Sequence, residues 1–144
     1  MCELTANEVQ TINPGADAIF TLAPVPCTDG FVRYRLGTGN ILLSGWMPAG
    51  TCRRKNASYF VDFGANIAIA SGSAVGAISV AIAQDGAVIP TSQMIVTPAA
   101  VEEYFNISTA LNVGIFRNCC ETITVRNTST VPILMQNANI VIDR

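Results

Sequence analysis

The sequence predicts an all-β fold, an antiparallel sandwich of about ten strands, on three observations. Short apolar or alternating runs recur along the whole chain, and clusters of turn-forming Gly, Pro, Asn, Asp and Ser separate them. No segment of about ten residues or more has the apolar spacing of an amphipathic helix. The length of 144 residues is typical of one domain. We therefore expect a single domain over residues 1–144.

Three short runs predict the first strands. They are DAIFTL (17–22), FVRYRL (31–36) and NILLSG (40–45), and the turn-forming segments APVPCTDG and GTG stand between them. The next run, YFVDFGANIAIA (59–70), alternates apolar side chains with Asp62 and small residues, as a strand with one buried face does. These runs predict four strands joined by short connections.

The segment ISVAIAQDGAVIP (78–90) predicts a tight hairpin, because Asp85-Gly86 stands between two apolar runs and Gly accepts a positive φ. One face of its first run carries branched aliphatic side chains: Ile78, Val80 and Ile82. The other face carries small uncharged ones: Ser79, Ala81 and Ala83. Such a small face favours close approach of another sheet or of another subunit.

The last third of the chain predicts the remaining strands. Pro98 is expected to end or bulge a strand within residues 92–116. ETITVRNTST then alternates with its apolar residues on one side, and VPILMQNANIVIDR places Ile140 and Ile142 on one face of a final strand. Two packed antiparallel sheets accommodate this number of strands.

The composition predicts self-association. Half of the residues are apolar and only 12% are charged, compared with about 25% in an average domain. No apolar run approaches the ~18–20 residues of a membrane span, so no membrane partner is expected. We expect the surplus apolar surface to be buried between identical subunits. The residues expected in inter-sheet or intersubunit packing are Ile78, Val80, Ile82, Ile140 and Ile142.

The charge distribution excludes a nucleic-acid partner. The net charge is -2, and the basic residues form two small groups, Arg33/Arg35 and Arg53-Arg54-Lys55, rather than a broad basic face. The first ten residues, MCELTANEVQ, contain neither the basic region nor the apolar region of a classical signal peptide. We expect a protein made in a cytoplasm that stays there or leaves by a route other than secretion.

Side chains that could catalyse a reaction are scarce. The sequence has no histidine, which removes the commonest general base and metal ligand. Glu102 and Glu103 are adjacent, so on a strand they point to opposite faces and do not converge on one substrate. No glycine-rich phosphate loop occurs. We expect no enzyme activity, no metal and no cofactor.

The five cysteines leave three interpretations open: reduced structural thiols, disulfides, or a metal or redox site. No Cys-x-x-Cys pair occurs, which disfavours zinc. Neighbours such as Cys119 and Cys120 do not readily bridge each other. If disulfides form, the candidates are Cys27, Cys52 and the 119–120 loop, since all lie at turns that flank strands. We expect Cys119 and Cys120 chiefly to shape a corner before the penultimate strand.

One group of residues is a candidate ligand site. Trp46, Tyr34 and Asn40 could contact a sugar by ring stacking and amide hydrogen bonds. A lone aromatic residue beside a glycine-flanked turn is more often part of the core, and we expect that position for Trp46.

Several motifs resemble those of a known group of proteins. They are the hairpin at 78–90, the segment IVTPAAVEEYFNIS (95–108), the Cys-Cys turn, the closing VRNTST and NANIVI, and the opening ELTANEVQTINPGADAIF. Together they resemble small proteins encoded by phages and prophages of gut Firmicutes. More distantly, they are similar to the TNF/C1q-like jelly-roll domains that end bacterial collagen-like and exosporium proteins. The resemblance covers most of the chain. This sequence differs from the collagen-like relatives in that it has no Gly-X-Y stalk.

The resemblance implies a ten-strand jelly roll that forms a homotrimer, with the C-terminal strand in the inner sheet near the threefold axis. It also implies a non-enzymatic virion structural protein: a capsid decoration, head-fibre or spike subunit on the particle surface, assembled in the bacterial cytoplasm. Its partners would be copies of itself and capsid or other virion proteins. The alternative is a receptor- or glycan-binding jelly-roll module of a phage tail or cell surface, which would use Tyr34, Asn40 and Trp46.

Overall fold

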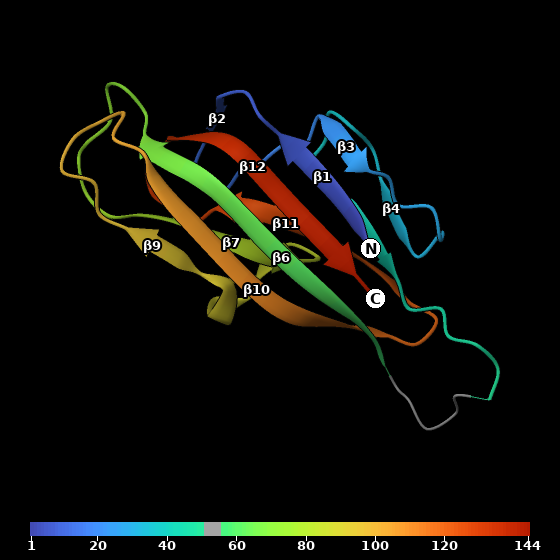
Figure 1. The fold of residues 1–144 in the computed structure, drawn as a ribbon. Helices are drawn as coiled ribbons and strands as arrows, with labels where there is room; N and C mark the ends of the chain where they lie inside the picture. Colours follow the sequence, from blue (N-terminus) through green and yellow to red (C-terminus); the bar gives the residue numbers. More distant parts are fainter. Residues whose placement is uncertain (51–55) are drawn as a thin grey trace.

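The computed structural model describes residues 1–50 and 56–144, which form two antiparallel sheets packed face to face (Figure 1). Sheet A has the order β10-β6-β12-β1-β3, with β2 also paired to β12. Its strands are β1 (Cys2–Ala6), β2 (Gln10–Ile12), β3 (Leu22–Val25), β6 (Asn56–Ile69), β10 (Phe105–Phe116) and β12 (Ile133–Asp143). The C-terminal strand therefore lies in the middle of this sheet.

Sheet B has the order β4-β5-β11-β7-β8, with β9 also paired to β7. Its strands are β4 (Val32–Tyr34), β5 (Ile41–Ser44), β7 (Ile78–Gln84), β8 (Ala87–Val88), β9 (Met94–Val96) and β11 (Cys120–Asn127). A single 3₁₀ turn, η1 (Pro90–Ser92), is the only helical segment within the described residues. The predicted all-β jelly roll is confirmed, with twelve strands in the described part of the chain rather than about ten.

The core lies between the two sheets and follows the alternation of the strands. Tyr59, Val61 and Phe63 of β6 face Ile123 and Val125 of β11 across the sandwich, and all five are fully buried. The predicted packing residues are at most 1% exposed: Ile78, Val80, Ile82, Ile140 and Ile142. Their own chain buries these side chains. Of the two roles expected for them, inter-sheet packing is the one that this position allows, because nothing remains exposed for a second subunit.

The hairpin at 78–90 forms as predicted. Asp85 and Gly86 adopt φ angles of 47° and 81° between β7 and β8, and Asp85 Oδ1 accepts a hydrogen bond of 2.8 Å from the Thr122 amide. The small residues Ala81 and Ala83 are fully buried within the chain itself. A second subunit therefore does not reach them.

The Arg126 side chain ties three segments together on the outside of sheet B. Its Nε donates to Asp17 Oδ1 at 2.9 Å, and its Nη1 donates to the Gly86 carbonyl at 2.8 Å. The loop before β3, strand β11 and the β7–β8 turn are thereby joined by one guanidinium, whose planar fork suits such multiple bonding. The charge of Arg126 on the outer surface of sheet B is thus paired within the chain.

The strand predicted at residues 17–22 is wrong, because β3 begins only at Leu22. Asp17 and Phe20 form isolated bridges, to Arg126 and Thr38. The Gln10 side chain explains the difference: its Oε1 accepts from the Ile19 amide at 2.8 Å and its Nε2 donates to the Ile19 carbonyl at 3.0 Å. A side chain thus occupies backbone groups that a continuous strand would pair.

The effect expected of Pro98 is confirmed, since β9 ends at Val96 and β10 begins at Phe105. The intervening turn is closed by Glu103, whose Oε2 accepts from the Ala99 and Ala100 amides at 3.1 and 3.2 Å. Glu103 is therefore a structural residue of this loop.

Among the described residues, no helical segment has the length and apolar character that crossing a membrane requires.

Candidate functional site

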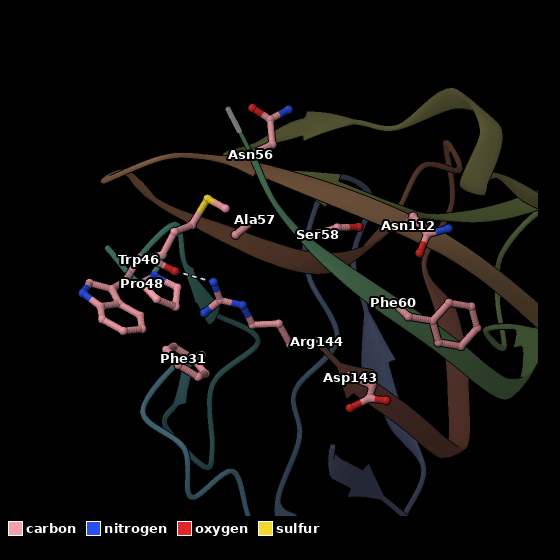
Figure 2. Close-up of a pocket in the computed structure, with 11 residues that line it drawn as sticks. Phe31, Trp46, Pro48, Asn56, Ala57, Ser58, Phe60, Asn112, Asp143 and Arg144 are labelled. Atoms are coloured by element: carbon pink, nitrogen blue, oxygen red, sulfur yellow. Dashed lines mark hydrogen bonds between the residues drawn. The ribbon is translucent and has the colours of Figure 1, made fainter. Parts of the chain in front are cut away.

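An open groove lies at the end of the sandwich where β6 begins and β12 ends. Its volume is about 600 Å³, within the ~300–1,000 Å³ of typical ligand sites. Phe31, Arg144 and the residues after β5 form one wall, and the outer faces of β6, β10 and β12 form the other (Figure 2). The lining residues are Phe31, Trp46, Met47, Pro48, Asn56, Ala57, Ser58, Phe60, Asn112, Asp143 and Arg144.

The first wall is a stack of two rings and a guanidinium. The rings of Phe31 and Trp46 are stacked with centroids 5.6 Å apart and an angle of 19° between their planes. The guanidinium of Arg144 lies 4.1 Å from the centroid of Phe31, and its Nη2 donates to the Trp46 carbonyl. These contacts hold the indole in place. Much of its surface stays accessible, since 53% of Trp46 is exposed.

Tyr59 supports this wall from the core. Its hydroxyl donates to the Ser44 carbonyl at 2.5 Å, at the end of β5 where the chain turns towards Trp46. Burial raises the pKa of the Tyr59 hydroxyl, against the opposing effects of the nearby Arg144 charge and of the hydrogen bond to Ser44. The hydroxyl therefore stays neutral and acts as a fixed donor.

Gly45 and the Cys-Cys corner explain why Trp46 points outward. A Cβ at Gly45 would collide with the Phe116 carbonyl and lie 2.7 Å from the Cys119 carbonyl, so only glycine fits between β5 and this corner. The Gly45 amide donates to the Cys119 carbonyl at 2.7 Å, and the Asn118 amide donates back to Gly45 at 3.2 Å. The next residue, Trp46, is thereby carried beyond the edge of the sheet.

The second wall alternates polar and aromatic side chains on the outer face of sheet A. Asn56, Ser58 and Phe60 follow one another at every second position of β6, a spacing of about 6.6–6.8 Å. Phe60 pairs across the strands with Asn112 on one side and Asp143 on the other. The side chains of Asn56, Ser58 and Asn112 are exposed, and 45% of Phe60 is exposed. These groups are available to a ligand.

The two charged residues of the groove have opposite signs. Asp143 Oδ1 lies 3.1 Å from the amino group of Met1, and the hydrogen bond between them lowers the pKa of the Asp143 carboxyl. The described lining therefore carries one negative charge, on Asp143, and one positive charge, on Arg144. The groove combines ring faces, amides and a hydroxyl, and the charges of its lining side chains sum to zero.

The predicted ligand residues do not converge. Trp46 lines the groove, and the expectation that it belongs to the core is wrong. Tyr34 ends β4 opposite Ile41, and Asn40 immediately precedes β5, so both lie at the other end of this hairpin from Trp46. Phe60, Asn112 and Arg144 were not predicted as site residues. The exposure of Phe60 could have been read from the alternation, which places it on the same face as Asp62.

The cysteines divide into a disulfide and two free thiols. Cys27 forms a disulfide, but with Cys2, which the sequence did not single out. Cys119 and Cys120 are free and exposed at the corner before β11, where Asn118 has a positive φ of 63°. The corner role expected for them agrees with this geometry. Cys52 lies outside the described residues, and within those residues no cluster of three metal-ligating side chains occurs.

Comparison with known proteins identifies the fold. No protein-family model matches the sequence, and no curated protein sequence matches it. Among solved structures, the Eiger TNF from S. frugiperda aligns with 98% of this chain and 88% of its own, at a TM-score of 0.65 and 11% identity. The globular domain of zebrafish complement 1qA protein aligns with 97% of this chain and 94% of its own, at a TM-score of 0.55 and 8% identity. The chain therefore has the jelly-roll fold that TNF and C1q globular domains share.

Proposed function

We propose that this protein is a non-enzymatic structural subunit that forms a homotrimer on the surface of a phage particle, as a capsid decoration, head-fibre or spike protein. Its work is mechanical: copies of the jelly roll pack against one another and dock onto other virion proteins. The observation that carries the proposal is the outer face of sheet A.

This outer face carries mainly small, uncharged side chains. Figure 1 shows its long strands side by side in front of sheet B. Alternate residues form it beyond the groove-lining positions: Asn106, Ser108 and Ala110 of β10; Asp62, Gly64 and Asn66 of β6; Gln136, Asn139 and Val141 of β12; and Glu3 of β1, which pairs with Val141. Asp62 and Glu3 are the charged residues among them. Small side chains without charge permit close approach of a second sandwich at low desolvation cost.

Both outer faces contain polar groups that bind one another. On sheet B, Ser79 Oγ lies 2.7 Å from Thr128 Oγ1, and Arg126 binds Asp17. On sheet A, Asn106 donates to Asn66, and Asn139 donates to Glu3. We assign sheet A to self-association because of the small uncharged side chains that its long strands present.

The amount of exposed surface does not by itself demand a partner, contrary to the expectation from composition. The accessible surface is 7352 Å² for 15.2 kDa, close to the ~7,100 Å² expected for a monomeric protein of this mass. The sandwich buries a large hydrophobic core between its two sheets unaided. Where the remaining uncharged surface lies, rather than how much there is, supports the trimer.

The location on a particle rests on the resemblance of the sequence to phage-encoded proteins and is supported by the disulfide. Disulfides persist outside the reducing cytoplasm, and Cys2–Cys27 fits a protein whose working life is spent on an extracellular particle. Assembly would take place in the bacterial cytoplasm, with oxidation following release.

Mass spectrometry of purified particles from the source, together with light scattering of the isolated chain, tests the proposal. We expect the protein in stoichiometric amounts in the particles, and a mass of three chains of 15.2 kDa in solution. Particles without the protein would contradict the virion role. A single-chain mass would contradict the trimer.

A further inference from the structure

We infer that the groove between Trp46 and Phe60 binds a neutral oligosaccharide. This goes beyond the structural role proposed above and does not depend on it. Figure 2 shows Trp46 with Phe31 on one side of the groove, Phe60 with Asn112 on the other, and Arg144 between them.

The exposed indole is the first reason. Of the Trp46 side chain, 53% is accessible, although Phe31 stacks on it with ring centroids 5.6 Å apart and Arg144 donates to its carbonyl. Fixing an aromatic ring in an open position favours ligand binding, because no ordering of the ring remains to be done when the ligand arrives. A sugar ring offers such a surface a face of C–H bonds.

The polar groups of the opposite wall are the second reason. A sugar carries hydroxyl groups around its rim, and each hydroxyl both donates and accepts hydrogen bonds. The amides of Asn56 and Asn112 and the hydroxyl of Ser58 also offer both functions, and they line the groove around Phe60. This combination of apolar ring faces with a few convergent neutral polar groups is typical of small-molecule sites.

The charge and the backbone favour a neutral sugar over two other classes of ligand. The side chains of the lining carry no net charge, because Asp143 and Arg144 have opposite signs, so the groove as a whole does not favour a sialylated, sulfated or phosphorylated ligand over a neutral one. Strand β6 lies inside sheet A between β10 and β12, so its backbone is not available for pairing with an extended peptide. Recognition over β6 therefore uses side chains, which suits a sugar.

The chain contains one tryptophan, so its fluorescence reports on this groove alone. An array of neutral, sialylated and sulfated oligosaccharides would be screened first, and a neutral binder would then be titrated by fluorescence and by calorimetry. We expect binding restricted to neutral oligosaccharides, with a change in Trp46 emission. Binding only to acidic glycans, or to no glycan on the array, would overturn the inference.

Three variants locate the site. Trp46→Ala and Asn112→Ala should each weaken binding at least tenfold by calorimetry, and Asn112→Ala keeps the fluorescent reporter. Phe105→Ala removes an exposed aromatic residue that does not line the groove and should leave affinity unchanged. Equal affinity in the Trp46→Ala variant would overturn the assignment, as would a Phe105→Ala variant that binds as weakly as the other two.

Sedimentation of the same samples separates this inference from the proposed trimer. Trp46→Ala and Asn112→Ala should keep the assembly state of the unmodified protein while losing the sugar. If either variant instead dissociates, the groove is a contact between subunits and not a ligand site, which would also overturn the inference. Far-ultraviolet circular dichroism confirms the fold of each variant, and Asn112, whose side chain is exposed on the sheet surface, is the safer of the two substitutions.

Discussion

Cys2 and Cys27 form a disulfide, with their Cα atoms 4.8 Å apart, that joins β1 to the residues following β3 at the edge of sheet A. The two strands pair irregularly, because the register shifts between Glu3 and Thr5. A covalent link therefore holds the edge of the sheet where the backbone ladder is interrupted. The bond closes a loop over a sequence separation of 25 residues.

Removing this disulfide should destabilise the fold measurably. A loop of this length is expected to contribute about 2–4 kcal/mol, mainly by restricting the unfolded chain. The double variant Cys2→Ser/Cys27→Ser should therefore melt roughly 5–15 °C below the unmodified protein in a calorimetric scan. Cys119→Ser/Cys120→Ser is the matched control and should change the free energy of unfolding by no more than about 0.5 kcal/mol. Equal losses in both double variants would contradict this role.

The free thiols give a second prediction, on chemical access. Cys119 and Cys120 are exposed and outside any disulfide, so iodoacetamide should modify both in the folded protein without prior reduction. Cys2 and Cys27 should be modified only after reduction, since the reagent requires a thiolate. Peptide mass spectrometry of the alkylated protein measures this, and protection of Cys119 and Cys120 in the native state would show that the corner is closed.

Gly45 gives a third prediction. Gly45→Ala places a methyl group against the Phe116 and Cys119 carbonyls, which are backbone atoms and do not move cheaply. We expect a loss of about 1–3 kcal/mol in the free energy of unfolding, measured by urea denaturation. Gly76→Ala is the matched control, because nothing lies within 4 Å of its added Cβ. It should be neutral or stabilise by up to about 1 kcal/mol, and a similar loss in both variants would contradict the explanation.

Tyr59 gives a fourth prediction, on alkaline stability. Because burial raises its pKa above the ordinary value of 10.0, the folded chain holds the phenol proton more tightly than the unfolded chain does. This contribution is complete below pH 10 and is lost as the pH rises through the folded-state pKa. Urea midpoints from about pH 8 to about pH 11 should fall more steeply for the unmodified protein than for Tyr59→Phe. Equal slopes of the urea midpoint against pH in the two proteins would contradict this effect of Tyr59.

The hairpin and the core could be read from the sequence because both depend on local geometry. Asp85-Gly86 favours a tight turn wherever it stands between two strands, and side chains alternate between the faces of any strand. The buried positions Ile78, Ile82 and Ile140 follow from that alternation alone. What alternation leaves open is which layer covers a face, so it did not distinguish inter-sheet from intersubunit packing.

Other features depend on contacts between distant parts of the chain and could not be predicted. The strand expected at 17–22 fails because the side chain of Gln10 binds the backbone of Ile19. The partner of Cys27 is decided by the pairing of β1 with β3, and no spacing rule reveals that pairing. Sequence reasoning therefore recognised Cys27 as a disulfide candidate without identifying Cys2.

The groove illustrates the same limit. Its aromatic wall brings together residue 31 before β4, residue 46 after β5 and residue 144 after β12, which meet only when the two sheets pack. Trp46 is exposed because Gly45 packs closely against the backbone carbonyls of Phe116 and Cys119. This contact joins distant parts of the chain, so it could not be read from the sequence. Tyr34 and Asn40, although near Trp46 in sequence, lie at the other end of the intervening strand.

The most direct test of self-association through sheet A is sedimentation equilibrium of two valine-to-arginine variants beside the unmodified chain. Val141 lies on the outer face of β12, whereas Val75 is 53% exposed in the loop before β7. We predict the mass of three chains for the unmodified protein and for Val75→Arg, and the mass of one folded chain for Val141→Arg. An unmodified protein that sediments as a single chain at micromolar concentration, or a Val141→Arg variant that remains a trimer, would contradict the account.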